Sequence, residues 1–349
     1  MPEGIIEHMQ FSLITNPADW QNLEVEWKAL EARTHRRLPF LEFWYQQTWW
    51  RTLGGGEWSR ESSQLQLIIA RRGGELVGAA PLFYSEKPEG PPALRFIGQV
   101  EVSDYLDFLC PLPDLHAFIA GLLDFISSEP GMLSRDLDLA NFQDASPSVP
   151  ILRNLCEQRN LKYSSEVLQP SPYIPLQSSW DEYLASISKK QRHEIRRKTR
   201  NAEARYDTDW YFVTAEHDVP AEVQAFIEMM RNDPSKESFL TPEMENFLVE
   251  TALNAYQAGL MHLSFLTFGG KRAAAYLSFL TGGKLWVYNS AWEPRFAPCS
   301  PGWVLLAKEI TWAIGSGLTE VDMMRGDEVY KYRFGGIDRY VISFKTSLH

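Results

Sequence analysis

The residues with the clearest chemical potential lie near the C-terminus, in the stretch VDMMRGDEVYKYRFGG, Val321–Gly336. An apolar, strand-like start is followed at once by charged residues and tyrosines: Arg325, Asp327, Glu328, Tyr330, Lys331, Tyr332 and Arg333. Carboxylates and phenols can move protons, and a fixed ammonium can hold an anionic intermediate. The pattern is typical either of a solvated loop or of a strand that opens into a site, and it leaves both interpretations open.

The composition is that of a globular protein. The 349 residues are 44% hydrophobic and 23% charged, which excludes wholesale disorder and allows one large domain or two of ordinary size. With 34 basic and 45 acidic residues the net charge is −11, so a general role in binding DNA is not expected. A local basic patch is compatible with this balance.

The cysteines and the apolar segments bear on compartment and metal sites. Cys110, Cys156 and Cys299 form no CxxC pair and are odd in number, which favours a reduced, cytoplasmic compartment and no zinc or other metal site. The N-terminal MPEGIIEHMQ has no basic start leading into an apolar run, so no signal peptide is predicted. The longest mostly apolar stretch, residues 115–126, is short and contains two polar residues, which predicts a core helix rather than a membrane span.

An internal repeat organises the chain. The segments Ile68–Tyr84 and Phe265–Leu280 both consist of an apolar run, a Gly-Gly pair, small residues and a second apolar run, which predicts a β-hairpin in each. Aligning Gly73 with Gly269 places Phe83 on Phe279 at the same offset of 196 residues (269 − 73 and 279 − 83). Such a match is a reason to test the flanking sequence for the same repeat.

The flanking elements repeat in the same order. Each hairpin is preceded by a strand-like segment and two helical patterns, and is followed by a strand, a helix and a strand. Asp138 and Asp322 lie at matching places in the last strands, within LDL and VDM. We therefore predict an α/β protein with mixed sheets, made of two copies of one unit.

A basic segment joins the two copies. Residues 178–205 contain no Pro or Gly and carry an apolar stripe at i, i+3, i+4 spacing, which predicts a helix. From Ser188 to Arg205 there are eight Lys or Arg and two Glu. This face is either merely solvated or a funnel for an anionic donor or acceptor. The expected division is an N-terminal unit 1–177, a basic linking helix 178–205 and a C-terminal unit 206–349.

At this point the sequence resembles a known family. The unit is similar to the GNAT acyltransferase fold, and two in tandem resemble Fem-type transferases of peptidoglycan and the CelD/BcsL-type proteins associated with cellulose and exopolysaccharide synthesis. Ser300–Gly335 is similar to the CelD/BcsL-type signature over its length, and SDYLDFL (Ser103–Leu109) and SKKQRHEIRRK (Ser188–Lys198) resemble further family blocks in the right order. The resemblance implies transfer of an acyl group, with acetyl expected, from acyl-CoA to an amine or hydroxyl of a small-molecule or polysaccharide-related acceptor.

The resemblance also implies where the donor binds. GNAT proteins hold the CoA pyrophosphate on backbone N–H groups at the start of a helix, where anions are favoured. In the second unit this loop falls in EPRFAPCSPGW, which gives Arg295, Ser300, Pro301 and Gly302 as donor-binding residues. Only one glycine is present, a departure from the family's glycine-rich pattern. In the first unit the corresponding EVSDYLDFLCPLPD has no glycine and four acidic residues, so donor binding is not expected there.

The resemblance assigns chemical roles to the opening segment. Fem-type enzymes carry a lysine in a similar YKFK…GFGG segment that is thought to stabilise the oxyanion, and Lys331 matches it. Asp322 or Asp327 is then the base, directly or through water, and Tyr330 the acid that protonates the leaving thiolate. The competing interpretation is a structural network of ion pairs.

Residues for the acceptor are expected in both units. They are Asp104, Tyr105, Tyr288, Arg325 and Arg333. For Asp104 and Tyr105 the alternative is a plain acidic turn. Two rival functions stay open: a Fem-type aminoacyl-tRNA-dependent transferase, in which the basic helix grips RNA phosphates, and a non-enzymatic binding protein on a degenerate GNAT fold.

Overall fold

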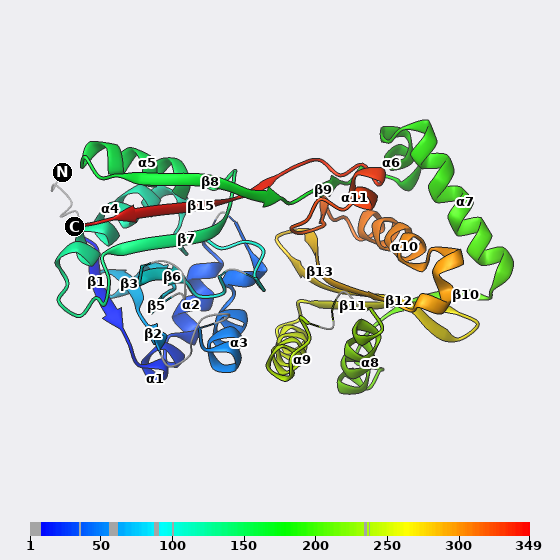
Figure 1. The fold of residues 1–349 in the computed structure, drawn as a ribbon, viewed down its shortest axis with the longest axis horizontal. Coiled ribbons are helices and arrows are strands. Elements are labelled where there is room, and N and C mark those ends of the chain that lie inside the picture. Colours follow the sequence, from blue (N-terminus) through cyan, green and yellow to red (C-terminus); the bar gives the residue numbers. More distant parts are fainter. Residues whose placement is uncertain are drawn as a thin grey trace, which may run out of the picture. The chain divides into compact units, whose positions relative to one another are not determined.

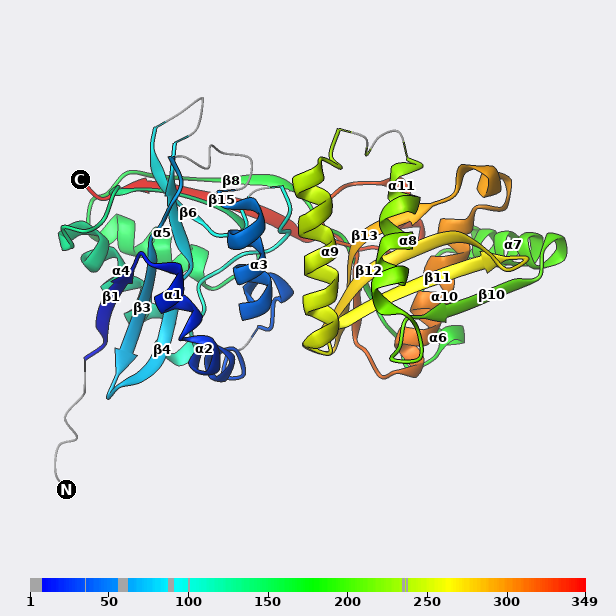
Figure 2. The same cartoon turned by 90° about the horizontal axis from the view of Figure 1, so that it is seen from below.

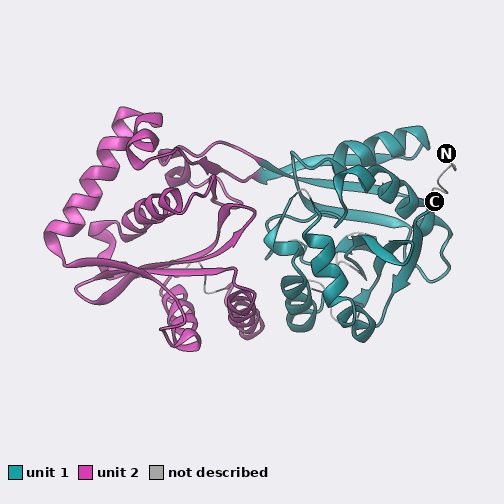
Figure 3. Ribbon diagram, turned by 180° about the vertical axis from the view of Figure 1, so that it is seen from behind, with its two compact units in different colours: residues 1–169, 340–349 teal, residues 170–339 magenta. Residues whose placement is uncertain are grey.

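The computed structural model describes residues 8–34, 36–55, 62–86, 91–99, 101–233, 236 and 238–349. Most of the N-terminal decapeptide considered above therefore lies outside the described residues. The chain divides into two compact units, residues 1–169 with 340–349 (unit 1) and residues 170–339 (unit 2), shown in Figure 3. It passes between them twice, after Gln169 and after Arg339.

Unit 1 contains two sheets (Figure 1). The three-stranded sheet has the order β1 (Gln10–Ile14), β3 (Leu67–Arg72), β4 (Glu75–Ala80). The six-stranded sheet has the order β2 (Gln64–Leu65), β5 (Leu82–Ser85), β6 (Ala93–Phe96), β7 (Asp136–Gln143), β15 (Tyr340–Ser347), β8 (Tyr163–Pro170). The helices are α1 (Pro17–Gln21), α2 (Glu24–Glu31), the 3-10 turn η1 (Pro39–Leu41), α3 (Phe43–Leu53), α4 (Leu112–Ser128) and α5 (Ser148–Gln158).

Unit 2 contains one six-stranded sheet between two layers of helices. The strand order is β10 (Thr208–Phe212), β11 (Met261–Phe268), β12 (Lys271–Thr281), β13 (Lys284–Trp292), β14 (Glu320–Asp322), β9 (Tyr173–Pro175). The helices are α6 (Trp180–Ser186), α7 (Lys189–Arg205), α8 (Val219–Arg231), α9 (Pro242–Gln257), the 3-10 turn η4 (Pro294–Cys299), α10 (Pro301–Gly315) and α11 (Val329–Arg333). Helices α8 and α9 cover one face and α10 the other (Figures 1 and 2).

The predicted hairpins are present in both units and match in detail. Each Gly-Gly pair forms a two-residue turn with positive φ at both positions, 57° and 83° in unit 1 and 57° and 73° in unit 2, which only glycine adopts without strain. The strand register also shifts at the same point, after Ala70 in β3 and after Leu266 in β11. These two residues are 196 positions apart (266 − 70), the offset of the sequence repeat.

The strands after each hairpin also correspond. β6 pairs in parallel with β7, and β13 in parallel with β14. Asp138 follows Leu137, which pairs with Leu94, and Asp322 follows Val321, which pairs with Leu285, so the two aspartates occupy equivalent positions. The units are thus two copies of one arrangement of strands and helices.

The boundaries of the units differ from the predicted ones in three places. Residues 170–177, which include β9, belong to unit 2 and not to the N-terminal unit. The last strand, β15, belongs to unit 1, where it lies between β7 and β8. Its Phe344 is fully buried and stacks on Tyr163 of β8 at 5.6 Å between ring centroids. The basic segment forms two helices, α6 and α7, within unit 2, because Tyr183, Leu184 and Ile195 of its apolar stripe join the core beneath α10.

This placement of β15 generates a stability prediction. Phe344→Ala removes a fully buried ring, which typically costs about 3–5 kcal/mol, and the loss should fall on unit 1 although the residue lies near the C-terminus. Amide hydrogen exchange should show lost protection in β6 and β7 and unchanged protection in β11 to β13. Tyr340→Ala, in the same strand but 38% exposed, is the matched control and should change little. Uniform loss of protection across both units would contradict the prediction.

Candidate active site

The edge of β13 is open beyond its first three residues. β14 pairs with β13 only from Lys284↔Glu320 to Trp286↔Asp322, whereas β13 continues to Trp292. Further along, Glu293 N–H donates to the Ala273 carbonyl at 3.0 Å. In an antiparallel pair the backbone groups of alternate residues point to the same neighbour, so odd-numbered residues here bond to β12. The backbone groups of Ser290 therefore point to the opposite edge of β13. β13 therefore presents backbone donors and acceptors there that β14 does not use.

The start of α10 is open at Gly302. Ser300 is the N-cap residue and Pro301 occupies the first helical position, as predicted, but the Ser300 side chain makes no capping hydrogen bond. Its backbone is left-handed (φ 51°), and its carbonyl accepts the N–H groups of Trp303 and Val304. A Cβ built on Gly302 would meet no atom within 4 Å. A ligand can therefore approach the positive end of this helix closely.

Two cations from different elements flank this helix start. The Lys198 ammonium of α7 lies 3.7 Å from the centroid of the Trp303 ring, and the Arg333 guanidinium of α11 lies 6.0 Å from it. Burial lowers the pKa of Lys198, and the neighbouring Arg197 and Arg333 charges lower it further, against the attraction of Glu194. The basic helix thus brings positive charge to the predicted anion site at the start of α10. The sequence predicts the helix and the site but does not show that they lie together.

Arg295 has its contacts elsewhere in unit 2. It is exposed on η4, lies 3.9 Å from the Glu293 carboxylate and stacks over Phe296. It also lines a polar hollow of about 700 Å³ together with Tyr211 and Arg272. Of the predicted donor-binding residues, Ser300, Pro301 and Gly302 therefore lie together at the start of α10, and the contacts of Arg295 connect it with the β11–β12 hairpin.

Lys331 is buried and its ammonium is fully engaged. The Nζ atom donates to the carbonyls of Met324, Arg325 and Gly326 at 3.2, 2.8 and 3.2 Å, and lies 2.8 Å from the Glu328 carboxylate. An ammonium has three N–H groups, and these acceptors take all of them. The geometry favours the structural interpretation over the oxyanion role.

Asp322 is likewise committed to an internal contact. It is fully buried, accepts the Met324 N–H at 2.9 Å, and forms an ion pair of 2.8 Å with Arg339. Arg339 also binds Glu320 and stacks on Tyr173 of β9. A carboxylate held by a buried guanidinium is a poor proton acceptor. The structure therefore favours a structural role for Asp322 over the role of base.

Two phenols lie near the start of α10. The Tyr276 hydroxyl of β12 donates to the Gly302 carbonyl at 3.5 Å, and Tyr330 is half-buried on α11. Burial raises the pKa of both phenols, with the Glu328 charge adding to each. Both therefore stay protonated at neutral pH and can act as proton donors. The sequence analysis did not select Tyr276. The 196-residue offset pairs it with Ala80 of unit 1, and a tyrosine that only one copy of the repeat carries is a signal that could have identified it.

The remaining predicted residues fall into two groups. In unit 2, Tyr288 is the extra residue at the register shift of β13, Arg325 is half-buried in the turn that Lys331 holds, and Asp327 is exposed. In unit 1, Asp104 and Tyr105 are buried, and the Tyr105 ring lies against Phe40. This burial favours the alternative for Asp104 and Tyr105, a structural acidic turn, over the predicted acceptor-binding role.

In unit 1 the chain itself connects β4 with β7 through the segment around Leu106 and Leu109. Leu106 N–H donates to the Asn141 carbonyl of β7, and Leu109 forms a bridge with Ala79 of β4. Asp107 anchors this segment by accepting the hydroxyls of Ser146 and Ser148, each at 2.5 Å. These bonds give the residues of the SDYLDFL block a structural role in unit 1.

The helix start in unit 1 is also unlike that of α10. The first turn of α4 carries Asp114, which pairs with Arg72 at 2.8 Å, whereas the first turn of α10 has no acidic residue. A negative side chain here opposes a second anion. This difference supports the expectation that unit 1 does not bind the donor.

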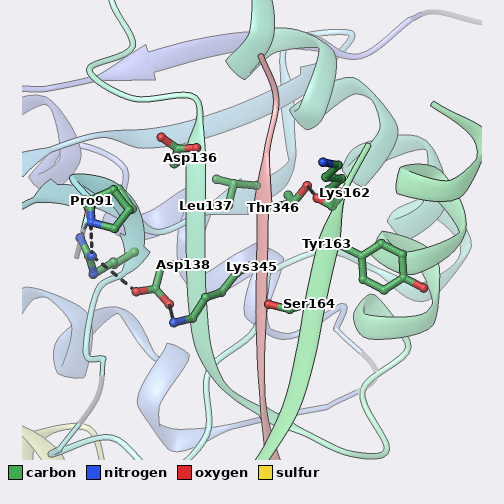
Figure 4. Close-up of a pocket in the computed structure, with 11 residues that line it drawn as sticks. Pro91, Asp136, Leu137, Asp138, Lys162, Tyr163, Ser164, Lys345 and Thr346 are labelled. Atoms are coloured by element: carbon green, nitrogen blue, oxygen red, sulfur yellow. Dashed lines mark hydrogen bonds and ion pairs between the residues drawn. The ribbon is translucent and has the colours of Figure 1, made fainter. Parts of the chain in front are cut away.

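A pocket of about 360 Å³ lies along the sheet of unit 1 (Figure 4). Asp138 lines it, between Arg95 at 3.4 Å and Lys345 of β15 at 3.6 Å. Asp322 has the equivalent position and also binds a cation from a segment near the crossing between the units. The aspartate that the repeat shares thus has a structural partner in both units.

Comparisons with known proteins match the fold. A family model described as an acetyltransferase (GNAT) domain matches residues 189–332. The solved structure of FemX superimposes with a TM-score of 0.64 at 14% identity, covering 96% of this chain and 96% of that one. A conserved protein of unknown function from Bacteroides thetaiotaomicron gives 0.61 at 13% identity, covering 97% and 99%. L-PGS from Bacillus licheniformis gives 0.53 at 11% identity, covering 91% and 90%. No curated protein matches the sequence.

The predicted fold, mixed α/β with two tandem GNAT-like units, is confirmed. The identities are too low to carry function across, so the likeness concerns architecture. Within the described ranges no cluster of three or more His, Cys, Asp or Glu is arranged to hold a metal. Across the same part of the chain, no helix combines the length and apolarity needed to traverse a bilayer.

The environment of Lys331 generates a prediction that separates its two interpretations. Lys331→Met leaves three backbone carbonyls without their donor, so the free energy of unfolding should fall by about 3 kcal/mol. Urea unfolding followed by tryptophan fluorescence measures this. Lys308→Met removes a more exposed lysine whose contact with Glu203 is 3.8 Å, and should change stability by less than about 1 kcal/mol. Unchanged stability in Lys331→Met would restore the oxyanion role.

Proposed function

We propose that this protein is an acyltransferase that moves an acyl group, expected to be acetyl, from acyl-CoA to an amine or hydroxyl. The observation that carries the proposal is the open helix start at Gly302, flanked by Lys198 and Arg333. A diphosphate suits such a place because backbone N–H groups and cations converge there. The open edge of β13 then suits the amide-containing arm of the donor, which adds to a strand edge as another strand does.

The proposed chemistry uses groups of unit 2. The acceptor attacks the thioester carbon, and its proton passes to Asp327 through water, since Asp327 is exposed and Asp322 is engaged with Arg339. Tyr330 protonates the departing thiolate, since a phenol carries its proton at neutral pH and can donate it. Tyr276 is a second proton donor near the same helix start. Tyr288, Arg325 and Arg333 are the residues proposed to contact the acceptor.

The proposed acceptor is a small molecule or a precursor of a surface polysaccharide. This part rests on the CelD/BcsL-type resemblance of Ser300–Gly335 and on the cytoplasmic compartment expected from the sequence. All three cysteines are free and buried, which fits a reduced environment.

A second candidate is a Fem-type aminoacyl-tRNA-dependent transferase. The likeness of fold to FemX and L-PGS favours it, as does α7, whose exposed residues include Lys189, Lys190 and Arg196. A tRNA donor would bind with an affinity that falls steeply with salt, because each neutralised phosphate releases counterions. A diphosphate held at one helix start would show a far shallower dependence.

Thermal-shift measurements separate these candidates from a non-enzymatic binding protein. Acetyl-CoA, longer acyl-CoAs, CoA and aminoacyl-tRNA are compared at two salt concentrations, since a ligand that binds only the native state raises its stability. A shift with acetyl-CoA that resists salt supports the proposal. A shift with aminoacyl-tRNA alone would replace it with the second candidate, and no shift with any donor would sink both.

The helix start itself gives a sharp test of the donor site. Gly302→Asp places a carboxylate in open space, where the fold tolerates it and the helix dipole favours it. Repulsion of the diphosphate should nevertheless weaken acetyl-CoA binding tenfold or more, measured by calorimetry. Gly302→Asn is the neutral control of the same shape and should lose much less. Equal losses in both variants would show that the effect is steric.

A further inference from the structure

One lysine reaches the open edge of β13 from the opposite layer of helices. Lys236 lies between α8 and α9, and its ammonium donates to the Ser290 carbonyl. The residue is half-buried, and burial lowers the pKa of its ammonium, against the attraction of Asp233 and Glu328. Its position is therefore set by one backbone acceptor and two nearby carboxylates.

The Ser290 carbonyl, which accepts the hydrogen bond from Lys236, lies on the side of β13 that faces away from β12. Ser290 lies opposite Tyr276 of β12, but this is a pair without backbone hydrogen bonds. The bond from Glu293 N–H to the Ala273 carbonyl shows that the odd-numbered residues of β13 are the ones that bond to β12. The Ser290 carbonyl therefore points to the edge that β14 has left. Lys236 thus marks the edge to which the proposed donor would add.

The Glu328 carboxylate acts electrostatically on Lys236 and on the two phenols of the proposed chemistry. Its negative charge opposes the lowering of the Lys236 pKa and adds to the raised pKa values of Tyr276 and Tyr330. Lys331, the cation expected from the sequence, has its N–H groups on three carbonyls. Within the described residues, Lys236 donates one side-chain hydrogen bond, to a backbone carbonyl, so two of its three N–H groups are left for a ligand.

We propose that Lys236 is a catalytic residue that stabilises the oxyanion of the tetrahedral intermediate, in the role that the sequence assigned to Lys331. The inference rests on the proposed acyl transfer. In the step, the acceptor nitrogen or oxygen forms a bond to the thioester carbon, and the carbonyl electron pair moves onto oxygen beside the ammonium. The pair then returns, the C–S bond breaks, and Tyr330 protonates the thiolate. The proton of the acceptor leaves through water, and Lys236 keeps its own throughout.

The kinetic test compares Lys236→Met with wild type under single turnover. Loss of one oxyanion donor typically costs on the order of 10²–10³ in rate, whereas acetyl-CoA affinity should change less than threefold. Lys236→Arg should restore only part of the rate, because its planar group presents donors in a different geometry. Lys271→Met, an exposed lysine in the β11–β12 turn, is the control and should transfer normally. A Lys236→Met variant with the wild-type rate would overturn the proposal and leave the acyltransferase function intact.

A second measurement does not depend on finding the acceptor. Reductive methylation followed by mass spectrometry reports how accessible each lysine amine is, with and without saturating acetyl-CoA. Lys236 should be protected at least fivefold by the donor, and Lys271 should be modified equally in both samples. Equal modification of Lys236 while the donor is bound would overturn its placement. Absence of any donor binding, seen as no thermal shift, would instead overturn the proposed function and this inference with it.

Discussion

The hydrogen bonds from Lys331 to the turn at Met324–Gly326 determine the shape of the candidate site. After Asp322 the chain turns sharply through Met324 and Gly326, which have φ values of 58° and 113°. A non-glycine residue in this region is strained, and three carbonyls converge as a result. The buried ammonium of Lys331 binds all three and thereby keeps the turn closed.

The consequences of this turn reach every group of the site. Because the chain leaves the sheet at Asp322, β13 continues alone and its Ser290 carbonyl is available to Lys236. Because Lys331 anchors α11 to the turn, Tyr330 of the same helix packs against the core cluster that contains Tyr276, and Arg333 lies 6.0 Å from the centroid of the Trp303 ring. A lysine with a purely structural role can thus be indispensable to the site. The sequence around Lys331 does not distinguish this structural role from an oxyanion-binding one.

The sequence was informative where the determinants are local. The Gly-Gly hairpins, the 196-residue repeat and the start of α10 at Ser300–Pro301 follow from residues adjacent in the chain, and each is found as predicted. The exchange of β15 into unit 1 could not be predicted this way, because its partner β7 lies about two hundred residues earlier. For Asp322, Lys331 and Tyr105 the sequence leaves the choice between a chemical and a structural role open for the same reason. Burial and partners decide that choice, and residue type reveals neither. Lys236 carries no local signal at all.

The distribution of charge bears on which donor the site suits. The chain as a whole carries −11, yet Lys198 and Arg333 both lie near Trp303 at the start of α10, and the charge of Arg197 also lowers the pKa of Lys198. Like charges held together raise the free energy of the unliganded state, and a compact anion offsets this locally. At physiological ionic strength the field of such a cluster extends only about 8 Å, so it acts on an anionic group bound at the helix start itself. The exposed Lys189, Lys190 and Arg196 carry positive charge further along α7, where only a longer polyanion would reach them. The two proposed donors therefore differ in how many of these cations they neutralise, and the salt dependence of binding, rather than the net charge of the chain, separates them.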